Sequence, residues 1–173
     1  TVIEESSEKF VNYSRQFRHH TEDDSEIIWM SERDNWNHLY LYDKASGKVK
    51  NQITKGQWYV RQVLDVDEQN RRIYFSASGV NKDEDPYFIR YYSINFDGSD
   101  MRDMTPSKGM HNAWLSADNK YIVDVTSTVA DAPVAVLRNA ETGEHVMDLE
   151  KADISEIVAN GWKAPEVFVA KGR

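Results

Sequence analysis

The sequence predicts an all-β protein, a partial β-propeller of about three and a half four-stranded antiparallel blades. One pattern, a pair of strand candidates joined by a break that ends in glycine, occurs three times along the chain. Its glycines are Gly47, Gly98 and Gly143, which lie 51 and 45 residues apart, close to the roughly 40 to 50 residues of a propeller blade. The 173 residues suffice for one ordinary domain with a sizeable core, but they are too few for a closed ring.

The first repeat is expected over residues 14–54. After a candidate inner strand at Phe17–His20 come three runs, EIIWMS, WNHLYLYD and VKNQIT, separated by turn-forming Asp, Asn, Ser and Gly. Large side chains alternate on both faces of the middle run, so this strand should lie in a sheet that is covered on both sides. Trp36 and Tyr40 should therefore be buried.

The second and third repeats are expected over residues 57–105 and 109–149. Their candidate inner strands are Gly56–Asn70, in which apolar and polar residues alternate, and the run MHNAWLS. The break GVNKDEDPY in the second repeat predicts an exposed loop. Three aromatic side chains of these repeats are expected to fill the space between blades: Tyr74, Tyr92 and Trp114.

The segments outside the repeats predict less regular structure. Residues 1–3 are expected to form the outer strand of a preceding blade, and 150–173 an exit segment. Within the exit segment, helical spacing in EKADISEIVANGW predicts a short helix with Asp153 or Ser155 as cap and Gly161 as stop, before a last strand at Glu166–Ala170. The chain begins without methionine or leader and ends without a turn, so we expect a piece of a longer protein.

A propeller that is cut open should leave two apolar sheet faces uncovered, one at each end of the stack. A large apolar surface rarely stays bare on a soluble protein. The fragment is therefore expected to self-associate through its end blades, or else to be only marginally folded.

Composition excludes several classes of function. The net charge of −8, with acidic and basic residues mixed, argues against nucleic acid as a partner. The chain has no cysteine, and so no disulfide or thiolate metal site. It also has no apolar run near the roughly 18 residues of a membrane span.

The search for catalytic and metal-binding residues is negative. No glycine belongs to a G-x-S-x-G nucleophile elbow, so no catalytic residue is assigned. The adjacent His19 and His20 would point to opposite faces of a strand, and the other histidines are scattered, so no metal site is expected. The acidic loop at Asp83–Asp85 lacks the spacing of an EF-hand. No cofactor is predicted.

Two long strings resemble one known family. They are SERDNWNHLYLYD (Ser31–Asp43) and ITKGQWYVRQVLDVDEQNRRIYFSASG (Ile53–Gly79), and the likeness continues through KGMHNAWLSADNKYIVDVTSTVADAP to APEVFVAKGR. They are similar to the propeller domain of the dipeptidyl peptidase IV family of serine exopeptidases. The resemblance implies an eight-bladed ring, followed by an α/β-hydrolase domain that carries the catalytic serine, aspartate and histidine.

The resemblance also implies an activity. The intact parent would remove dipeptides or tripeptides after proline from a free amino terminus, in the periplasm or outside the cell, while the propeller filters and anchors the peptide. In this family a pair of glutamates holds the free amino terminus of the substrate, and that pair lies in an earlier blade. Glu4 and Glu5 are not that pair, because VIEESSEKFVNY around them matches the linker that follows it. Some members place an aromatic side chain and an arginine from a propeller loop near the substrate. Phe17 and Arg18, with Arg15, are the candidates here.

Two alternatives stay open at this point. The propeller could be a platform that binds a protein or ligand without peptidase activity, since a fold does not fix a function. A free-standing periplasmic binding protein is the other.

Overall fold

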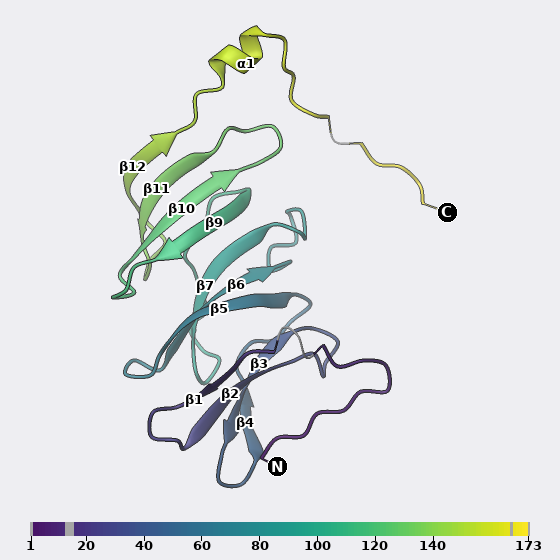
Figure 1. Ribbon diagram of the computed structural model, residues 1–173, viewed down its shortest axis with the longest axis vertical. Coiled ribbons are helices and arrows are strands. Elements are labelled where there is room, and N and C mark those ends of the chain that lie inside the picture. The colour runs from purple at the N-terminus through teal and green to yellow at the C-terminus, as the bar shows by residue number, and fades with distance from the viewer. Residues whose placement is uncertain (1, 13–15, 167, 173) are drawn as a thin grey trace.

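The computed structural model describes residues 2–12, 16–166 and 168–172. Within them the chain forms three four-stranded antiparallel sheets, each a meander of consecutive strands, which stack one on another along the long axis of the molecule (Figure 1). This confirms the predicted all-β partial propeller. The first sheet holds β1 (Arg18–His20), β2 (Glu26–Ser31), β3 (His38–Asp43) and β4 (Lys48–Gln52). The second holds β5 (Tyr59–Asp67), β6 (Arg72–Ser78), β7 (Ile89–Asn95) and β8 (Arg102–Asp103). The third holds β9 (Met110–Leu115), β10 (Tyr121–Ser127), β11 (Val134–Asn139) and β12 (His145–Lys151).

Apolar side chains that point alternately to the two faces of the second sheet form a core on each side of it. Toward the first sheet, Phe75 and Tyr92 pack against a cluster that includes Leu39 and Trp58. Toward the third sheet, the neighbouring residues Tyr74 and Tyr91 pack against a smaller cluster. Because successive side chains of a strand point to opposite faces, a run of apolar residues such as β6 or β7 serves both interfaces.

A threonine fixes each crossover from one sheet to the next. In the first sheet, Leu39 N donates to Thr54 Oγ1 at 2.9 Å while Ile53 N donates to Leu39 O at 2.8 Å. In the second, Tyr91 N donates to Thr105 Oγ1 at 3.0 Å. The threonine hydroxyl adds one more hydrogen bond to the sheet beyond the end of the outer strand. The chain then turns into the inner strand of the next sheet.

The third sheet has aspartate at the corresponding place. Ala152 N still donates to Pro133 O at 2.9 Å, but the Asp153 carboxylate accepts from Ser155 N at 2.8 Å instead of returning to β11. The chain therefore leaves the sheet and forms the short helix α1 (Ser155–Ala159), and Gly161 follows with φ +93°. The predicted helical turn is confirmed, but the predicted cap is wrong: Ile154 occupies the N-cap position and makes no side-chain capping hydrogen bond, because the Asp153 carboxylate accepts from Ser155 N just before the first turn.

The glycines of the second and third predicted turns pack against the outer edge of the sheet that precedes each of them. A Cβ on Gly98 would lie 2.8 Å from Ile53 O, and one on Gly143 would lie 2.6 Å from Asp103 O. Gly47 has the same relation to Val2 O, at 2.7 Å. All three glycines also have positive φ, between +67° and +85°.

The predicted strands at the two ends are wrong. Val2 and Ile3 belong to no strand, although Val2 occupies the place that an outer strand has beside the next glycine turn; Thr1 lies outside the described residues. The described residues of Glu166–Ala170 are likewise outside any strand, and Phe168 and Val169 are exposed. Neither segment has a neighbouring strand to supply backbone partners within the described chain.

Two of the five aromatic residues that were predicted to be buried are not. Tyr40, Tyr74 and Tyr92 are buried, as expected, but Trp36 is 37% exposed and Trp114 is 56% exposed. Trp36 precedes β3, which begins only at His38, and so it lies in the β2–β3 loop. Trp114 lies on the outward face of the third sheet, where no further sheet covers it.

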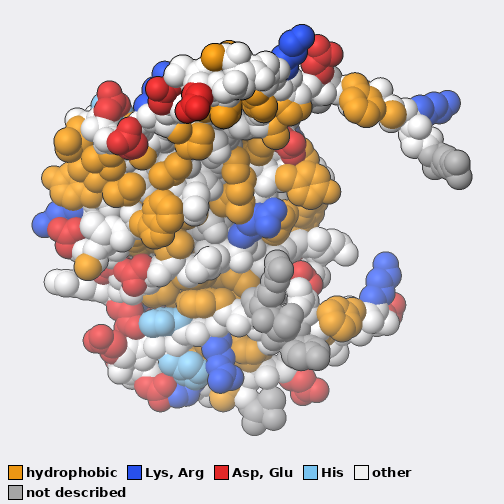
Figure 2. Space-filling view, turned by 45° about the horizontal axis from the view of Figure 1, so that its top comes forward, with side chains coloured by type: hydrophobic (Ala, Val, Ile, Leu, Met, Phe, Trp, Pro, Cys, Tyr) orange, Lys and Arg blue, Asp and Glu red, His pale blue; other side chains and the backbone are white. Residues whose placement is uncertain are grey.

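The two end faces of the stack differ, whereas both were expected to be bare. On the first sheet, Ile3 packs over Ile27, Tyr40 and Tyr42, and the Trp29 indole donates to Glu5 Oε2 at 2.9 Å. The amino-terminal segment thus covers part of that face. On the third sheet, register aligns a row of outward side chains, and Figure 2 shows hydrophobic side chains gathered over this part of the molecule. The row consists of Trp114, Val123, Leu137 and Met147.

Candidate functional site

The two ends of the sheets carry different kinds of connection. One end has the tight turns 21–25, 44–47, 68–71 and their counterparts in the third sheet, many of them closed by Asp or Asn side chains. The other end has the crossovers between sheets and the longer loops 32–37, 79–88 and 128–133. Loops on a rigid scaffold are where binding residues concentrate, so the second end is the candidate functional face.

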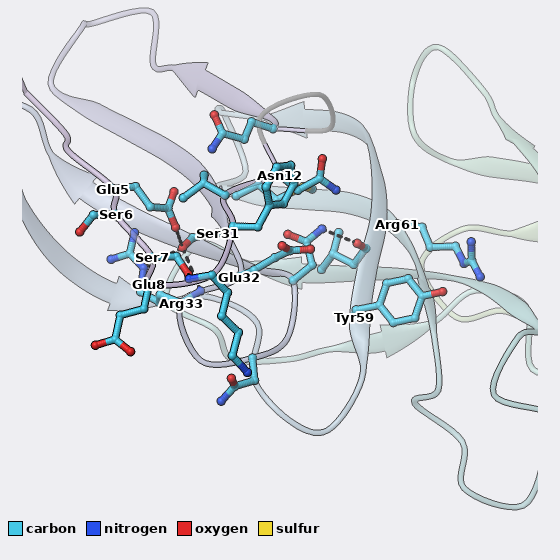
Figure 3. Close-up of a pocket in the computed structure, with 18 residues that line it drawn as sticks. Glu5, Ser6, Ser7, Glu8, Asn12, Ser31, Glu32, Arg33, Tyr59 and Arg61 are labelled. Carbon is cyan, nitrogen blue, oxygen red and sulfur yellow. Dashed lines mark hydrogen bonds between the residues drawn. The ribbon is translucent and has the colours of Figure 1, made fainter. Parts of the chain in front are cut away.

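A pocket of about 450 Å³ opens at this face of the first two sheets (Figure 3). The segment 5–12 forms one wall, the β2–β3 loop another, and the start of β5 a third. Most lining side chains are polar or charged. The acidic ones are Glu5, Glu8 and Glu32, and the basic ones are Lys9, Arg33 and Arg61.

Glu5 anchors the amino-terminal wall to the first sheet. One carboxylate oxygen accepts from Trp29 Nε1 at 2.9 Å, and the other accepts from the Ser31 hydroxyl. Both donors come from β2, two residues apart and therefore on the same face of the strand. The pocket wall is thus held by a side chain that itself faces the pocket.

Arg33 is held flat against the sheet. Its guanidinium lies over the Tyr40 ring, 4.3 Å from the centroid, and within 5.5 Å of the Tyr42 centroid, while its Nε donates to Ser31 Oγ at 2.9 Å. Burial, and after it the charge of Asp34, raise the pKa of Tyr40 to about 12, against the opposing charge of Arg33. Tyr40 is therefore a neutral ring beneath a cation, the arrangement that favours cation–π attraction.

The opposite wall repeats this design. Arg61 donates from Nε to Ser78 Oγ at 2.6 Å and lies 5.0 Å from the Tyr59 ring centroid. Asn37 joins the loop to the same strand, because its Nδ2 donates to Val60 O at 2.7 Å while Val60 N donates back to Asn37 O at 2.8 Å.

The three predicted substrate contacts follow the pocket-lining segment 5–12 in the sequence, and the structure describes two of them. Phe17 is half-buried against the core between the first two sheets, and its carbonyl accepts from Met30 N at 3.0 Å. Arg18 is exposed, and Arg15 lies outside the described residues. Their neighbour Gln16 lines the pocket. Sequence reasoning missed Arg33 and Arg61, although the S-x-R spacing in Ser31–Arg33 is visible in the sequence.

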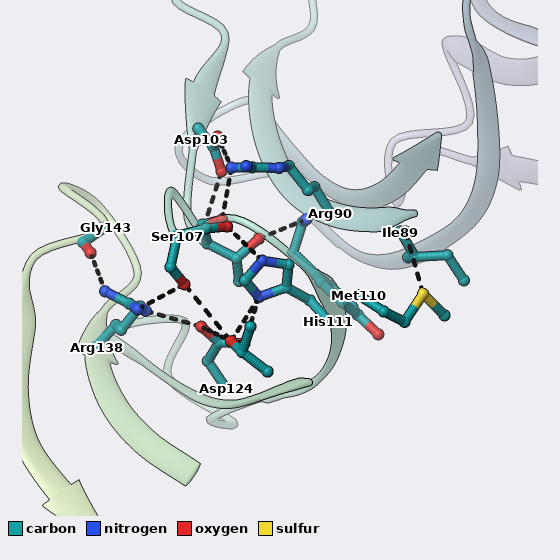
Figure 4. A network of polar contacts seen from close by, with 12 residues as sticks. Ile89, Arg90, Asp103, Ser107, Met110, His111, Asp124, Arg138 and Gly143 are labelled. Atoms are coloured by element: carbon teal, nitrogen blue, oxygen red, sulfur yellow. Dashed lines mark hydrogen bonds and ion pairs between the residues drawn. The ribbon is translucent and has the colours of Figure 1, made fainter. Parts of the chain in front are cut away.

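A second polar cluster, in the third sheet, brings serine, histidine and aspartate together (Figure 4). The His111 Nδ1 lies 2.7 Å from Asp124 Oδ1, but Nε2 faces the backbone carbonyl of Ser107, at 2.7 Å. The Ser107 hydroxyl instead accepts from Arg138 Nη2 at 3.1 Å. In a catalytic triad the serine hydroxyl forms a hydrogen bond with the imidazole. Ser107 does not, so this cluster is not a catalytic triad.

The same cluster holds a carboxylate in its charged form. Burial alone would raise the pKa of Asp124, but the hydrogen bond and charge of His111, and then those of Arg138, hold that pKa below its usual range. Asp124 and His111 are both fully buried. The network therefore stabilises the sheet.

Two further searches of the described residues are negative. No group of three or more His, Asp or Glu side chains is placed to hold a metal ion in the described part of the chain. Among its described helices, none is long and apolar enough to span a membrane.

Comparison with known proteins identifies the family. The family described as "Dipeptidyl peptidase IV (DPP IV) N-terminal region" matches residues 1–133. The chain belongs to the dipeptidyl peptidase IV family. The resemblance seen in Ser31–Asp43 and Ile53–Gly79 is thereby confirmed, and both strings lie within the matched residues.

Curated relatives within the dipeptidyl peptidase IV family include fungal enzymes. The chain is 29% identical over 96 residues to dipeptidyl peptidase 4 of Arthroderma otae, and equally to that of Trichophyton equinum. Each alignment covers 54% of this chain and 12% of the relative. The chain thus spans a small part of the length of these relatives.

Solved structures support the fold. Dipeptidyl peptidase 4 of Porphyromonas gingivalis aligns with a TM-score of 0.69 at 20% identity, over 89% of this chain and 21% of that one. A Bacteroides ovatus protein described as a dipeptidyl aminopeptidase IV aligns with the same TM-score at 22% identity, over 85% and 23%. At these identities the likeness concerns the propeller fold alone.

Proposed function

We propose that the chain is the non-catalytic propeller segment of a serine exopeptidase that removes di- or tripeptides after proline from free amino termini. Membership of the dipeptidyl peptidase IV family is the observation that carries this proposal. The aligned 96 residues cover 12% of the length of the curated relative, and in this proposal the chemistry would come from an α/β-hydrolase domain elsewhere in the parent. The parent would act in the periplasm or outside the cell.

In this proposal the end of the sheets with the long loops faces the hydrolase domain and the peptide. The pocket lies at that end, and its walls are fixed by Glu5, Arg33 and Asn37, so it offers a preformed surface to a substrate. The propeller would orient the peptide and restrict its size, while acyl transfer takes place on the other domain.

Arg15, Phe17 and Arg18 belong to the proposal as substrate contacts. The Phe17 side chain also packs against the core, so it would hold β1, and with it Arg18, in place.

The deciding experiment compares the intact parent with the 173-residue chain. Both are incubated with a Gly-Pro chromogenic substrate, and release of the chromophore is followed. The parent should cleave it and the chain should not, because the chain lacks a serine on a nucleophile elbow. An inactive but folded parent would contradict the proposal and favour a propeller that serves as a binding platform. Activity of the chain that survives substitution of each serine in turn would indicate contamination.

A further inference from the structure

The Arg33 guanidinium is only partly used by contacts within the chain. Its Nε is occupied by Ser31 Oγ, and one face of the planar group is occupied by Tyr40. Its terminal nitrogens, Nη1 and Nη2, have no carboxylate partner among the described residues. Arg33 is one of the residues that line the pocket (Figure 3).

Most of the other described arginines are used differently. Five of them pair with carboxylates of the chain: Arg71, Arg72, Arg90, Arg102 and Arg138. Arg33 and Arg61 form no such pair, and both line the same pocket with a serine on Nε and a tyrosine beside the guanidinium. The exposed Arg18 also lacks a carboxylate partner, but no ring or serine positions it.

The chemistry of a guanidinium held in this way selects its ligand. The group is planar, stays charged, and presents parallel N–H donors that match the two oxygens of a carboxylate. Holding Nε and one face in advance reduces the conformational entropy that is lost when the ligand binds. Glu8 and Glu32 line the same pocket, so a ligand with several negative charges would be repelled.

We propose that Arg33 binds a single carboxylate of a peptide in this pocket. The inference rests on the proposed function in one respect, the choice of a peptide as ligand, and it names a substrate class for that function: peptides with an acidic side chain or a nearby free carboxyl terminus. Lys9 and Arg61 are the other cations that line this pocket.

The test is a titration of the 173-residue chain with three blocked dipeptides, followed by NMR. The reporters are the Arg33 Nε–H signal and the Trp29 indole N–H signal, which are linked through Ser31 and Glu5. Acetyl-Ala-Glu-amide tests a side-chain carboxylate, and acetyl-Ala-Gln with a free carboxyl terminus tests a terminal one. Acetyl-Ala-Gln-amide is the neutral control. Saturable shifts with either acid and not with the neutral peptide support the proposal, and which acid acts identifies the source of the carboxylate. Equal response to all three, or to none, overturns it.

Three variants locate the effect. Arg33→Gln should weaken binding about tenfold or more, because the charge-assisted hydrogen bonds to the carboxylate are lost. Arg33→Lys should restore part of the affinity, because it keeps the charge without the planar fork. Arg102→Gln is the matched control, because that guanidinium pairs with Asp100 and Glu141 at the opposite end of the sheets. An unchanged affinity of folded Arg33→Gln overturns the proposal. If Arg33→Gln does not fold, the wild-type titration still decides.

Failure of this inference and failure of the proposed function can be told apart. Binding by the chain is measured without any catalytic step. A parent that cleaves Gly-Pro substrate while the chain ignores acidic peptides refutes only the carboxylate site. A chain that binds acidic peptides while the folded parent is inactive refutes only the peptidase.

Discussion

The two interfaces between the sheets are built in different ways. Between the first and second sheets, Trp58, Phe75 and Tyr92 stack in sequence, with ring centroids 6.2 and 5.8 Å apart, inside a large apolar cluster. The face of the third sheet that meets the second has a smaller apolar cluster and, beside it, the buried ionic network of His111, Asp124 and Arg138. The stability of an apolar interface does not depend on pH, whereas the stability of an ionic one depends on the charge of each residue in it. The third sheet should therefore be the first to loosen in acid.

The largest expected effect comes from the apolar interface. Phe75→Ala should lower the free energy of unfolding by about 3–5 kcal/mol, because it removes a fully buried ring between two others. Chemical denaturation monitored by tryptophan fluorescence measures the change. Trp114→Ala, an aromatic truncation on the bare face, is the control and should cost less than about 1 kcal/mol. Similar losses for the two would show that the faces do not differ as described.

The ionic interface should give the next largest effect. Asp124→Asn should cost about 2–3 kcal/mol near neutral pH, because it removes the charge that His111 and Arg138 share.

The pH dependence of this cost separates an ionic effect from a steric one. The folded pKa of Asp124 lies below its usual value, so its stabilisation is complete above about pH 4 and is lost as the pH falls through the lowered pKa. The difference between wild type and Asp124→Asn should therefore shrink in acid. A difference that stays constant down to about pH 2 would contradict an ionic interface.

The outward faces of the first and third sheets should differ in how readily they bind a second copy of the chain. We propose that the chain self-associates through the outward row of the third sheet, because the amino-terminal segment covers part of the corresponding face of the first. Met147→Glu should weaken association about tenfold or more, since it would bury a charge in the contact. Light scattering at several concentrations measures this. Val49→Glu, at a similarly exposed position of β4, is the matched control. A strictly monomeric wild-type chain would show that the row is covered in another way.

The smallest effect is expected at Trp36. Trp36→Ala should change the free energy of unfolding by less than about 1 kcal/mol, because the side chain lies in a loop and is 37% exposed. A loss of about 3 kcal/mol or more, typical of a core tryptophan, would place this ring in an interface after all.

Local patterns predicted the architecture well because it is repetitive. The spacing of Gly47, Gly98 and Gly143 and the alternation in the middle strands each specify a turn or a strand from nearby residues alone. Trp36 and Trp114 show where this fails. Whether an aromatic side chain of a strand is buried depends on whether another sheet covers that face, and that information lies outside the strand.

The candidate site was predicted less well than the fold. Arg33 becomes distinctive only when Tyr40, on the next strand, lies beneath it and Ser31 holds its Nε. Such a setting depends on strand register, which no motif in the sequence states. Phe17 shows the same limit, because its half-buried packing against the core between the first two sheets depends on neighbours that lie outside its own strand.

The glycine turns carry a consequence for how the protein is made. Each touches backbone that lies 40 to 45 residues earlier: Gly47 at Val2, Gly98 at Ile53 and Gly143 at Asp103. A chain that emerges from the ribosome amino terminus first would therefore present each docking edge before the turn that fits it. Each new sheet can therefore pack on a neighbouring sheet that has already folded. The sheets then stack in the right order without any contact between distant ends of the chain. The same three positions should be the ones where a side chain slows this stepwise growth most, because a Cβ there would meet backbone and not a movable side chain.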